Sequence, residues 1–430
     1  MGIGAFAEPF VVISLLAIGC YVNRETRDPT TMLVSASHKR DDSLESGGSS
    51  PSSEAGLLSP LDRPIHDAAA RTDFQGHHVR TIQVFGWRKD LVTVNTRQFA
   101  SRWFSRLIVH RKPFIVEVLY WALIYWVYQL ARAFSAYTLV EETVDVARRH
   151  ALQVIHLEQT LGIFWEPAIQ QFFLRYPTLM HWINRTYSFV HIPATITYLI
   201  WLYYLTITVN RTSYAETRER SPAGPVLYQA RRRMMAMCNL IAFVVFTAWP
   251  CMPPRLLSDP SYEGDDAQEA KSFGFVDTVH SAEGESSVWT KNKFCNQYAA
   301  MPSLHFGYSL LIGLTIAFLP LASDNRRRIG TMYGLRVPSL SLKRIVCLAV
   351  GFGYPALILT AIVATANHFI LDAVAGAMVC GLAWNAEPLT LNLLPLEDLF
   401  FWCIRTHKPS VDVEPMLSLE EKLGDRRSPT

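Results

Sequence analysis

The stretch at residues 296–307, NQYAAMPSLHFG, organises the chain together with NHFILD at residues 367–372. A long apolar run follows the first stretch, and another precedes the second. Each run can cross a bilayer, which takes about 20 residues in a helix. His305 and His368 therefore stand at the ends of two expected membrane spans. This arrangement predicts two polar clusters that meet at one face of the membrane.

The second stretch carries a histidine and an aspartate at helical spacing. His368 and Asp372 are four residues apart, so a helix places both side chains on one face. A carboxylate there can fix the tautomer of the imidazole and stabilise the charge that develops when the ring acts as a nucleophile. An acidic residue inside a membrane costs about 3 kcal/mol and marks a functional hypothesis. The spacing predicts that Asp372 orients His368.

The first stretch supplies an acid and a phosphate site. Pro302 suits the first turn of a helix, whose free N–H groups can bind phosphate. If His368 attacks a phosphorus atom, His305 can protonate the departing oxygen, and a phosphohistidine then passes the group to water or an alcohol. Donors to the phosphate oxygens are expected from Ser303 and from three basic residues before it: Arg255, Lys291 and Lys293. The mechanism needs no metal, and no cofactor is predicted.

Two other interpretations of these residues stay open. His305, His368 and Asp372 offer the atom types of a metal site. Each residue can also be structural, as single histidines at helix ends commonly are, and Arg255 can be an interfacial arginine whose head reaches water. The conjunction of two histidine clusters with an intramembrane carboxylate at helical spacing favours catalysis over these alternatives.

The composition is that of a membrane protein. Of 430 residues, 50% are hydrophobic and only 18% are charged, which is too apolar for an ordinary soluble domain. The net charge is +3, and no basic block is interleaved with aromatic residues, so a nucleic-acid partner is not expected. The chain has no P-loop and no dinucleotide fingerprint, so a nucleotide is not expected either. The expected partners are a phospholipid and a lipid alcohol.

The hydropathy pattern predicts an all-α fold with a six-helix transmembrane core and an N-terminal anchor over residues 1–22. Residues 23–100 are rich in Ser, Gly, Asp and Pro towards their start and predict a disordered or weakly structured cytosolic segment. The six-span catalytic domain is expected at residues 101–386, and a cytosolic tail at 387–430. The six spans are expected at residues 113–130, 187–209, 234–249, 302–321, 345–366 and 368–384.

The charge pattern predicts the orientation. Basic residues gather at residues 211–233 and 326–344, and the positive-inside rule places both segments in the cytosol. The histidine clusters are on the opposite side, so the catalytic face is expected in the lumen of the Golgi or ER, or outside the cell for a plasma-membrane protein. Glycosylation sequons begin at Asn184 and Asn210, and only Asn184 is expected on the lumenal side.

The two motifs resemble the membrane-bound type 2 phosphatidic acid phosphatase superfamily. Within it they are most similar to the inositolphosphotransferase branch, which includes fungal inositol phosphorylceramide synthase. AMPSLHFG at residues 300–307 and HFILDAVAG at 368–376 carry the resemblance, and PPRLL at 253–257 adds less specific support. The paired motifs are specific for the superfamily and much less so for a substrate.

The resemblance implies the roles that the chemistry suggests: His368 as nucleophile, Asp372 as its orienting carboxylate, His305 as general acid and Ser303 near the phosphate. The chain departs from the phosphatase pattern in two places. Ile362 stands where an arginine is expected six residues before the nucleophile, and the lysine-containing first motif is missing. Both departures favour a transferase that moves inositol phosphate from phosphatidylinositol to a ceramide-like alcohol. The alternatives are a lipid phosphate phosphatase and a non-catalytic membrane scaffold.

Overall fold

The structure is a computed structural model, and it is mostly helical. The chain divides into two compact units, one of Met1–Gly19 and Tyr120–Glu387 and one of Cys20–Leu119 and Pro388–Thr430. The structure describes residues 4–25, 71–72, 78–84, 86–138, 142–210, 223–263, 265–279, 297–321, 329–332, 335–338 and 340–407.

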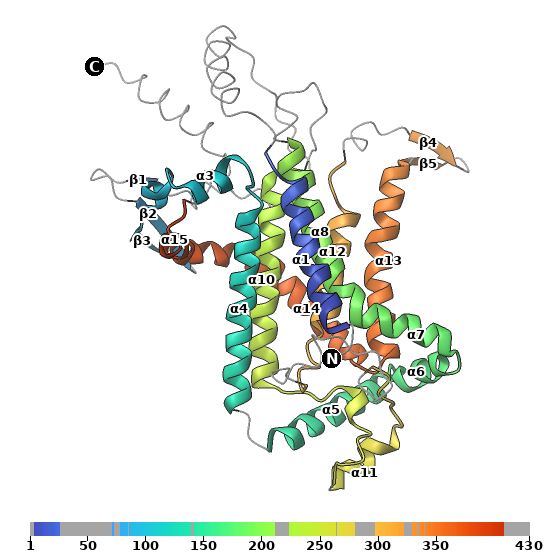
Figure 1. The fold of residues 1–430 in the computed structure, drawn as a ribbon. Helices are drawn as coiled ribbons and strands as arrows, with labels where there is room; N and C mark the ends of the chain where they lie inside the picture. The colour runs from blue at the N-terminus through green and yellow to red at the C-terminus, as the bar shows by residue number, and fades with distance from the viewer. Residues whose placement is uncertain are drawn as a thin grey trace, which may run out of the picture. The chain divides into compact units, whose positions relative to one another are not determined.

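Long helices make up the bundle of the first unit (Figure 1). They are α4 (Ile115–Thr138), α8 (His191–Tyr203), α10 (Pro225–Ala248), α12 (Leu304–Ala317), α13 (Leu342–Ala364) and α14 (Ile370–Ala386). Two π-helical turns, Thr186–Val190 and Tyr204–Thr208, flank α8. Helix α12 packs against α8, α10, α13 and α14, so the helix that begins at the first histidine motif is at the centre.

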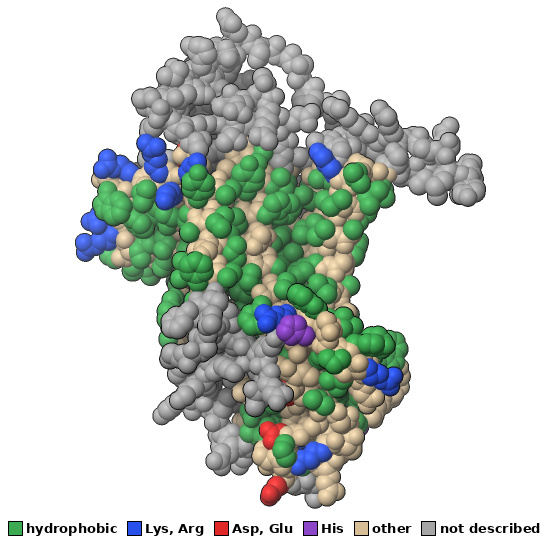
Figure 2. All heavy atoms as spheres, turned by 45° about the vertical axis from the view of Figure 1, so that its right-hand side comes forward, with side chains coloured by type: hydrophobic (Ala, Val, Ile, Leu, Met, Phe, Trp, Pro, Cys, Tyr) green, Lys and Arg blue, Asp and Glu red, His purple; other side chains and the backbone are tan. Residues whose placement is uncertain are grey.

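Three helical runs are long and apolar enough to cross a membrane: Pro177–Thr208, Leu342–Ala364 and Ile370–Cys403. They coincide with three of the six expected spans. Two of the other expected spans contain shorter apolar helices, at Ile115–Leu130 and Leu304–Ala317, and the six-span core stays a prediction. Figure 2 shows hydrophobic side chains over the sides of the bundle. Exposed members include Leu240, Val244, Val350, Phe352, Met378 and Leu382.

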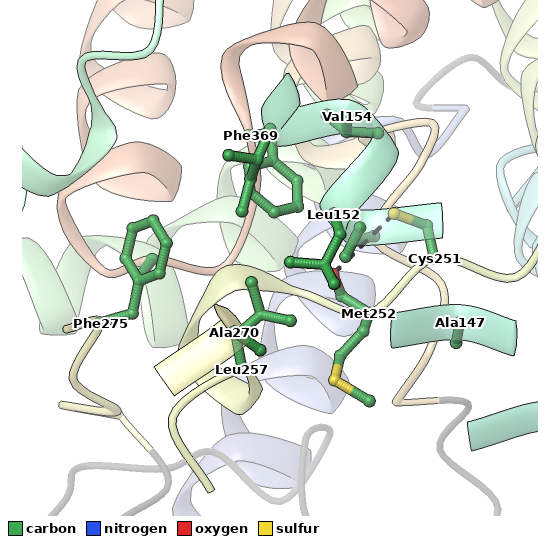
Figure 3. Packing of buried hydrophobic residues seen from close by; sticks show 13 residues of the cluster. Ala147, Leu152, Val154, Cys251, Met252, Leu257, Ala270, Phe275 and Phe369 are labelled. Atoms are coloured by element: carbon green, nitrogen blue, oxygen red, sulfur yellow. Dashed lines mark hydrogen bonds between the residues drawn. The ribbon is translucent and has the colours of Figure 1, made fainter. Parts of the chain in front are cut away.

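Short helices lie across one end of the bundle (Figure 1). They are α5 (Glu142–Leu161), α6 (Glu166–Leu174), α7 (Pro177–Arg185) and α11 (Asp265–Ser272). Helices α6 and α7 pack against α13, and α11 packs against α5. Figure 3 shows the apolar cluster at this end, in which Phe369 is packed with residues of α5 and of the segment after α10. The surface helices are therefore packed onto the turn that precedes α14.

Two close backbone contacts at glycine residues set how closely α12 approaches its neighbours. A Cβ atom on Gly376 of α14 would lie 2.3 Å from the carbonyl oxygen of Ser303, and one on Gly313 of α12 would lie 2.1 Å from that of Gly351. Real carbon and oxygen atoms do not approach so closely, so only glycine fits these positions. Gly376 is in the second turn of α14, and its close contact with Ser303 holds this part of the helix near the start of α12.

The second unit contains a small antiparallel sheet in the order β1 (Arg71–Thr72), β2 (His78–Val84) and β3 (Trp87–Thr93). Arg80 of β2 makes two hydrogen bonds to the carboxylate of Asp398, in α15 (Leu394–Cys403). The sequence predicts a disordered or weakly structured segment here, and the described strands are short. Residues 26–70 and 408–430 of the expected tails lie outside the described residues.

The remaining elements are short or stand at the chain's start. Helix α1 (Gly4–Val22) occupies the expected anchor segment. A 3₁₀ turn (Thr96–Phe99) and α3 (Trp103–His110) follow the sheet, and a 3₁₀ segment (Glu387–Leu393) precedes α15. Strands β4 (Ile329–Met332) and β5 (Leu335–Pro338) form a hairpin before α13.

Candidate active site

A tight turn between α13 and α14 carries the second histidine motif. Helix α13 ends at Ala364, and Ala366 adopts a left-handed backbone conformation with φ 51°. The N–H groups of Asn367 and His368 both donate to the carbonyl oxygen of Ile362, at 3.0 and 3.2 Å. A non-glycine residue rarely adopts positive φ, and such strain is found where the surrounding structure fixes a turn. The turn holds His368 immediately before the first turn of α14.

The imidazole of His368 is anchored by the other motif. Its Nδ1 lies 2.8 Å from the carbonyl oxygen of Ala300. A carbonyl oxygen only accepts hydrogen bonds, so Nδ1 carries the ring proton and Nε2 keeps its lone pair. The His368 side chain is 8% exposed. The contact produces the tautomer that a nucleophilic Nε2 requires.

Asp372 acts on His368 from a greater distance than the sequence suggests. Its Oδ2 is 3.6 Å from Nδ1 of His368, which is beyond hydrogen-bond distance but close enough for a charge interaction. The same oxygen accepts the N–H of Phe369 at 2.8 Å, as an N-terminal cap of α14. The backbone N–H of Ser303 donates to the carbonyl oxygen of Asp372 at 2.9 Å. Asp372 thus joins the two motifs, and its carboxylate is close enough to stabilise a positive charge that develops on the ring.

His305 lies on the first turn of α12 and faces the other histidines. Its ring centroid is 5.6 Å from that of His368 and 4.8 Å from that of His191. The ring of Tyr187 is 4.9 Å from it on the π-helical turn before α8. His191 is buried, and its Nδ1 is 3.4 Å from the hydroxyl oxygen of Tyr354. The expected pair of imidazoles is therefore a row of three.

Arg255 is attached to the turn that carries His368. Its backbone N–H donates to the carbonyl oxygen of Ala366 at 2.8 Å, and its Nε donates to Oδ1 of Asn367 at 2.9 Å. Its Nη1 is 3.0 Å from Oδ2 of Asp277. In the part of the chain that the structure describes, Nη2 has no hydrogen-bond partner. The guanidinium is thus fixed beside Asn367, the residue before His368, and Nη2 has the geometry of a donor that can bind an anion.

The other expected phosphate ligands differ in their placement. Ser303 is completely buried, and its hydroxyl accepts the N–H of Phe306 at 3.4 Å as the N-terminal cap of α12. The helix begins at Leu304, so Pro302 precedes the cap and is not in the first turn as the sequence suggests. Lys291 and Lys293 lie outside the described residues. Among the described residues, no group of three or more His, Cys, Asp or Glu side chains is arranged to hold a metal ion.

Sequence reasoning missed four residues of this region. His191 stands inside an expected membrane span, and that position alone could have marked it. Glu158 and Glu166 are fully buried acids, and each accepts a backbone N–H at the start of α14. Their positions among apolar residues of amphipathic helices gave no sign of this contact, which depends on how α5 and α6 pack. Asp277, which no motif singles out, binds Arg255.

A comparison with protein families finds one match. A family model described as the PAP2 superfamily matches residues 152–217, 223–335 and 329–386, which together make up more than half of the chain. The chain belongs to the PAP2 superfamily. No curated protein and no solved structure matches the chain significantly.

Membership of the PAP2 superfamily and the three apolar helical runs together indicate an integral membrane protein. They also indicate lipid phosphatase or phosphotransferase chemistry with lipid substrates. The matched residues include Arg255, His305, His368 and Asp372. The side chains that the sequence singles out thus lie within the region that defines the family.

Proposed function

We propose that this PAP2 protein is a lipid phosphotransferase that moves inositol phosphate from phosphatidylinositol to a ceramide-like alcohol through a phosphohistidine. The observation that carries the proposal is the tautomer of His368 and the position of its ring beside His305. Its Nδ1 proton is held by the carbonyl of Ala300, and its ring lies 5.6 Å, centroid to centroid, from that of His305. A nucleophile with a fixed tautomer and a neighbouring acid are the two groups that a two-step phosphoryl transfer needs.

In the first step, Nε2 of His368 attacks phosphorus, and the bond from phosphorus to the diacylglycerol oxygen breaks. His305 gives its proton to that departing oxygen. The ring of His368 becomes positively charged, and this charge is stabilised by the Ala300 carbonyl at 2.8 Å and the Asp372 carboxylate at 3.6 Å. Arg255 donates to the phosphate oxygens, on which negative charge gathers in the transition state.

In the second step, the hydroxyl group of the lipid alcohol loses its proton to His305. Its oxygen attacks the phosphorus, and the bond between phosphorus and Nε2 of His368 breaks. His305 then holds the proton with which it began, so the cycle needs no external proton donor. With water in place of the alcohol, the same steps would hydrolyse the lipid.

Two observations favour transfer over hydrolysis. Ile362, at the position where the phosphatase pattern has an arginine, is fully buried in an apolar cluster, so that position offers no charge to a phosphate. The side chain of His368 is only 8% exposed, which limits the access of water to a phosphohistidine. In this proposal the positive charge beside the phosphate comes from Arg255, which lies in a different segment from Ile362.

We also place the catalytic face in the lumen of an endomembrane. This orientation follows from the basic residues at 211–233 and 326–344, which the positive-inside rule assigns to the cytosol. The amide of Asn184 donates to the carbonyl oxygen of Thr278, in the segment that also supplies Asp277 to Arg255. The first sequon thus belongs to the same side of the protein as the site.

The test is headgroup transfer by the purified full-length protein in detergent. Radiolabelled phosphatidylinositol with ceramide, and separately phosphatidic acid, are the two substrates, and His368→Ala is the inactive variant. We expect a labelled sphingolipid that His368→Ala does not form, and acid-labile label on the wild-type protein. Free phosphate from phosphatidic acid without transfer would establish hydrolysis instead. A His368→Ala variant with full cellular function would establish the scaffold interpretation.

A further inference from the structure

Two buried acids lie against the helix that follows His368, and the proposed reaction does not use them. Glu158 is in the last turns of α5, and Glu166 begins α6. The turn between the two helices passes through Gly162, whose φ of 70° suits glycine. Both glutamates are completely inaccessible to solvent. A buried charge of this kind is costly unless it is paired or neutralised, so the two side chains require a physical account.

Each glutamate binds one N–H group of the first turn of α14. Oε1 of Glu166 accepts the N–H of Ile370 at 2.8 Å, and Oε1 of Glu158 accepts the N–H of Leu371 at 2.8 Å. The preceding N–H, that of Phe369, donates to Asp372. Three consecutive N–H groups at this helix end are therefore held by carboxyl groups. They are unavailable to a phosphate, which a free helix N-terminus would attract.

The two glutamates also contact each other. Their carboxyl groups interact electrostatically, and a proton on one of them would let it donate to the other. The Oε2 atom of each glutamate is buried and has no hydrogen-bond partner among the described residues, and a shared proton would supply one. Burial and the contact with Glu166 raise the pKa of Glu158 to about 9, and burial raises the pKa of Glu166. We therefore expect the pair to hold one proton at neutral pH and to carry a single negative charge.

The surroundings of the pair keep this proton in place. The neighbouring cluster is apolar and includes Phe369, Leu152 and Cys251 (Figure 3). The other titratable groups in electrostatic contact with Glu158 are Asp372 on α14, whose negative charge opposes ionisation, and the thiol of Cys251, whose own pKa burial raises. A second ionised carboxylate would repel both its partner and Asp372.

We propose that Glu158 and Glu166 are positioning residues, which share one proton and clamp the first turn of α14 so that His368 stays in place against Ala300 and His305. The inference rests on the proposed function, because it assigns the pair a part in the transfer reaction. The clamp connects two surface helices to the turn that carries the nucleophile. Its loss displaces His368 without removing any group that touches the substrate.

The shared proton gives the clamp a pH dependence of known sign. The folded protein holds a proton on Glu158 up to a pKa of about 9, whereas an unfolded chain releases it near the ordinary value of 4.5. Between these values the folded state binds more protons, so its stability falls as the pH rises. Above the folded pKa, two carboxylates occupy the site and the clamp opens. Transfer activity should therefore decline as the pH rises through the pKa of Glu158 in the folded protein.

The experiment compares wild type, Glu158→Gln and Glu158→Ala. A glutamine keeps an oxygen for the N–H of Leu371 and an N–H for Glu166, with no proton to lose, so we expect it to retain activity without the alkaline decline. Alanine removes the bond to Leu371 and the carboxyl group beside Glu166. We expect kcat to fall about 100-fold, as ångström-scale misplacement of a reacting group can cause, with KM little changed. Glu269→Gln is the matched control, because Glu269 is an exposed acid that binds His156 of α5.

A second readout needs no turnover. The infrared absorption of a protonated carboxyl group should be present in the wild-type protein at pH 7, disappear above about pH 9, and be absent from Glu158→Gln. The thermal unfolding temperature in detergent should fall as the pH rises, and it should fall more for the wild type than for Glu158→Gln. A missing carboxyl band, or a Glu158→Ala variant with the wild-type kcat, would overturn the clamp. Inactivity of the wild type with every lipid would count against the proposed transfer alone.

Discussion

The Nδ1 nitrogen of His368 is held by a backbone carbonyl, that of Ala300, at 2.8 Å. A carbonyl cannot change its protonation state, so the tautomer of His368 does not depend on the ionisation of a neighbouring acid. Asp372, at 3.6 Å, is left to stabilise charge. The hydrogen bond and the charge interaction therefore come from two different residues, and they can be separated by mutation.

Asp372→Asn tests the charge alone. An asparagine oxygen can still cap the N–H of Phe369, so α14 should keep its first turn. The positive charge on His368 loses its carboxylate, and we expect kcat to fall by about 10² or more, as loss of an orienting carboxylate does in other histidine-dependent enzymes. Steady-state transfer kinetics measure the change. Thermal unfolding of the same sample serves as the control, and a wild-type kcat would show that the Ala300 carbonyl suffices.

Arg255→Met tests the phosphate-binding cation. The variant keeps the backbone N–H to Ala366 but loses the guanidinium beside Asn367. We expect kcat/KM to fall about 100-fold, since hydrogen bonds from a charged group to phosphate are worth about 1.5–3 kcal/mol each. Initial rates over a range of lipid concentrations measure this.

Asp277→Asn is the matched control for Arg255. It weakens the ion pair at 3.0 Å but leaves the guanidinium charge and its bond to Asn367. The loss of activity should be smaller than in Arg255→Met. Equal losses in the two variants would mean that Arg255 acts as a structural tie between the segment around residue 277 and the turn before His368.

The spans that end at the site were predictable from the sequence, because long uninterrupted apolar runs in a protein of this composition indicate membrane-spanning helices. The expected spans 345–366 and 368–384 lie close to Leu342–Ala364 and Ile370–Ala386. The proximity of the two histidine motifs followed from their places at span ends. Its precise form did not, because the bond to Ala300 depends on backbone positions that no sequence pattern records.

The surface helices were harder to interpret. Nothing local in the sequence of α5 and α6 indicates that Glu158 and Glu166 turn inwards to α14. An acid on an amphipathic helix is ordinarily solvated. The row of histidines was missed for a similar reason, because His191 is distant in sequence from both motifs and comes beside His305 only when α8 packs against α12.

Gly376→Ala tests the close approach of α12 and α14. A Cβ atom there would meet the backbone oxygen of Ser303 at 2.3 Å, and neither helix can yield without moving His368 or His305. We expect a loss of about 1–3 kcal/mol in the free energy of unfolding, as for overpacked cores, together with reduced transfer. Gly381→Ala on the same helix is the control, because a Cβ at that position meets nothing within 4 Å. Equal effects of the two substitutions would mean that the glycine contact does not limit packing.

The last prediction concerns the membrane orientation. Asn184 should carry no glycan although we place it in the lumen, because its side chain is buried and bonded to Thr278. Asn210 should carry none because it precedes a segment that the positive-inside rule assigns to the cytosol. A second sequon on the expected lumenal side is therefore needed, and Gly284→Asn creates one, Asn-Glu-Ser, in the segment that joins Val279 to the first histidine motif.

Ala215→Asn creates the matched sequon, Asn-Glu-Thr, in the basic segment 211–233. After expression in a glycosylating host, a shift in gel mobility that an endoglycosidase reverses should occur for Gly284→Asn and not for Ala215→Asn. Both substitutions leave the site residues unchanged, so activity should persist in each. A glycan on Ala215→Asn alone would invert the orientation and place His305 and His368 in the cytosol, where the transfer would draw on lipids of the opposite leaflet.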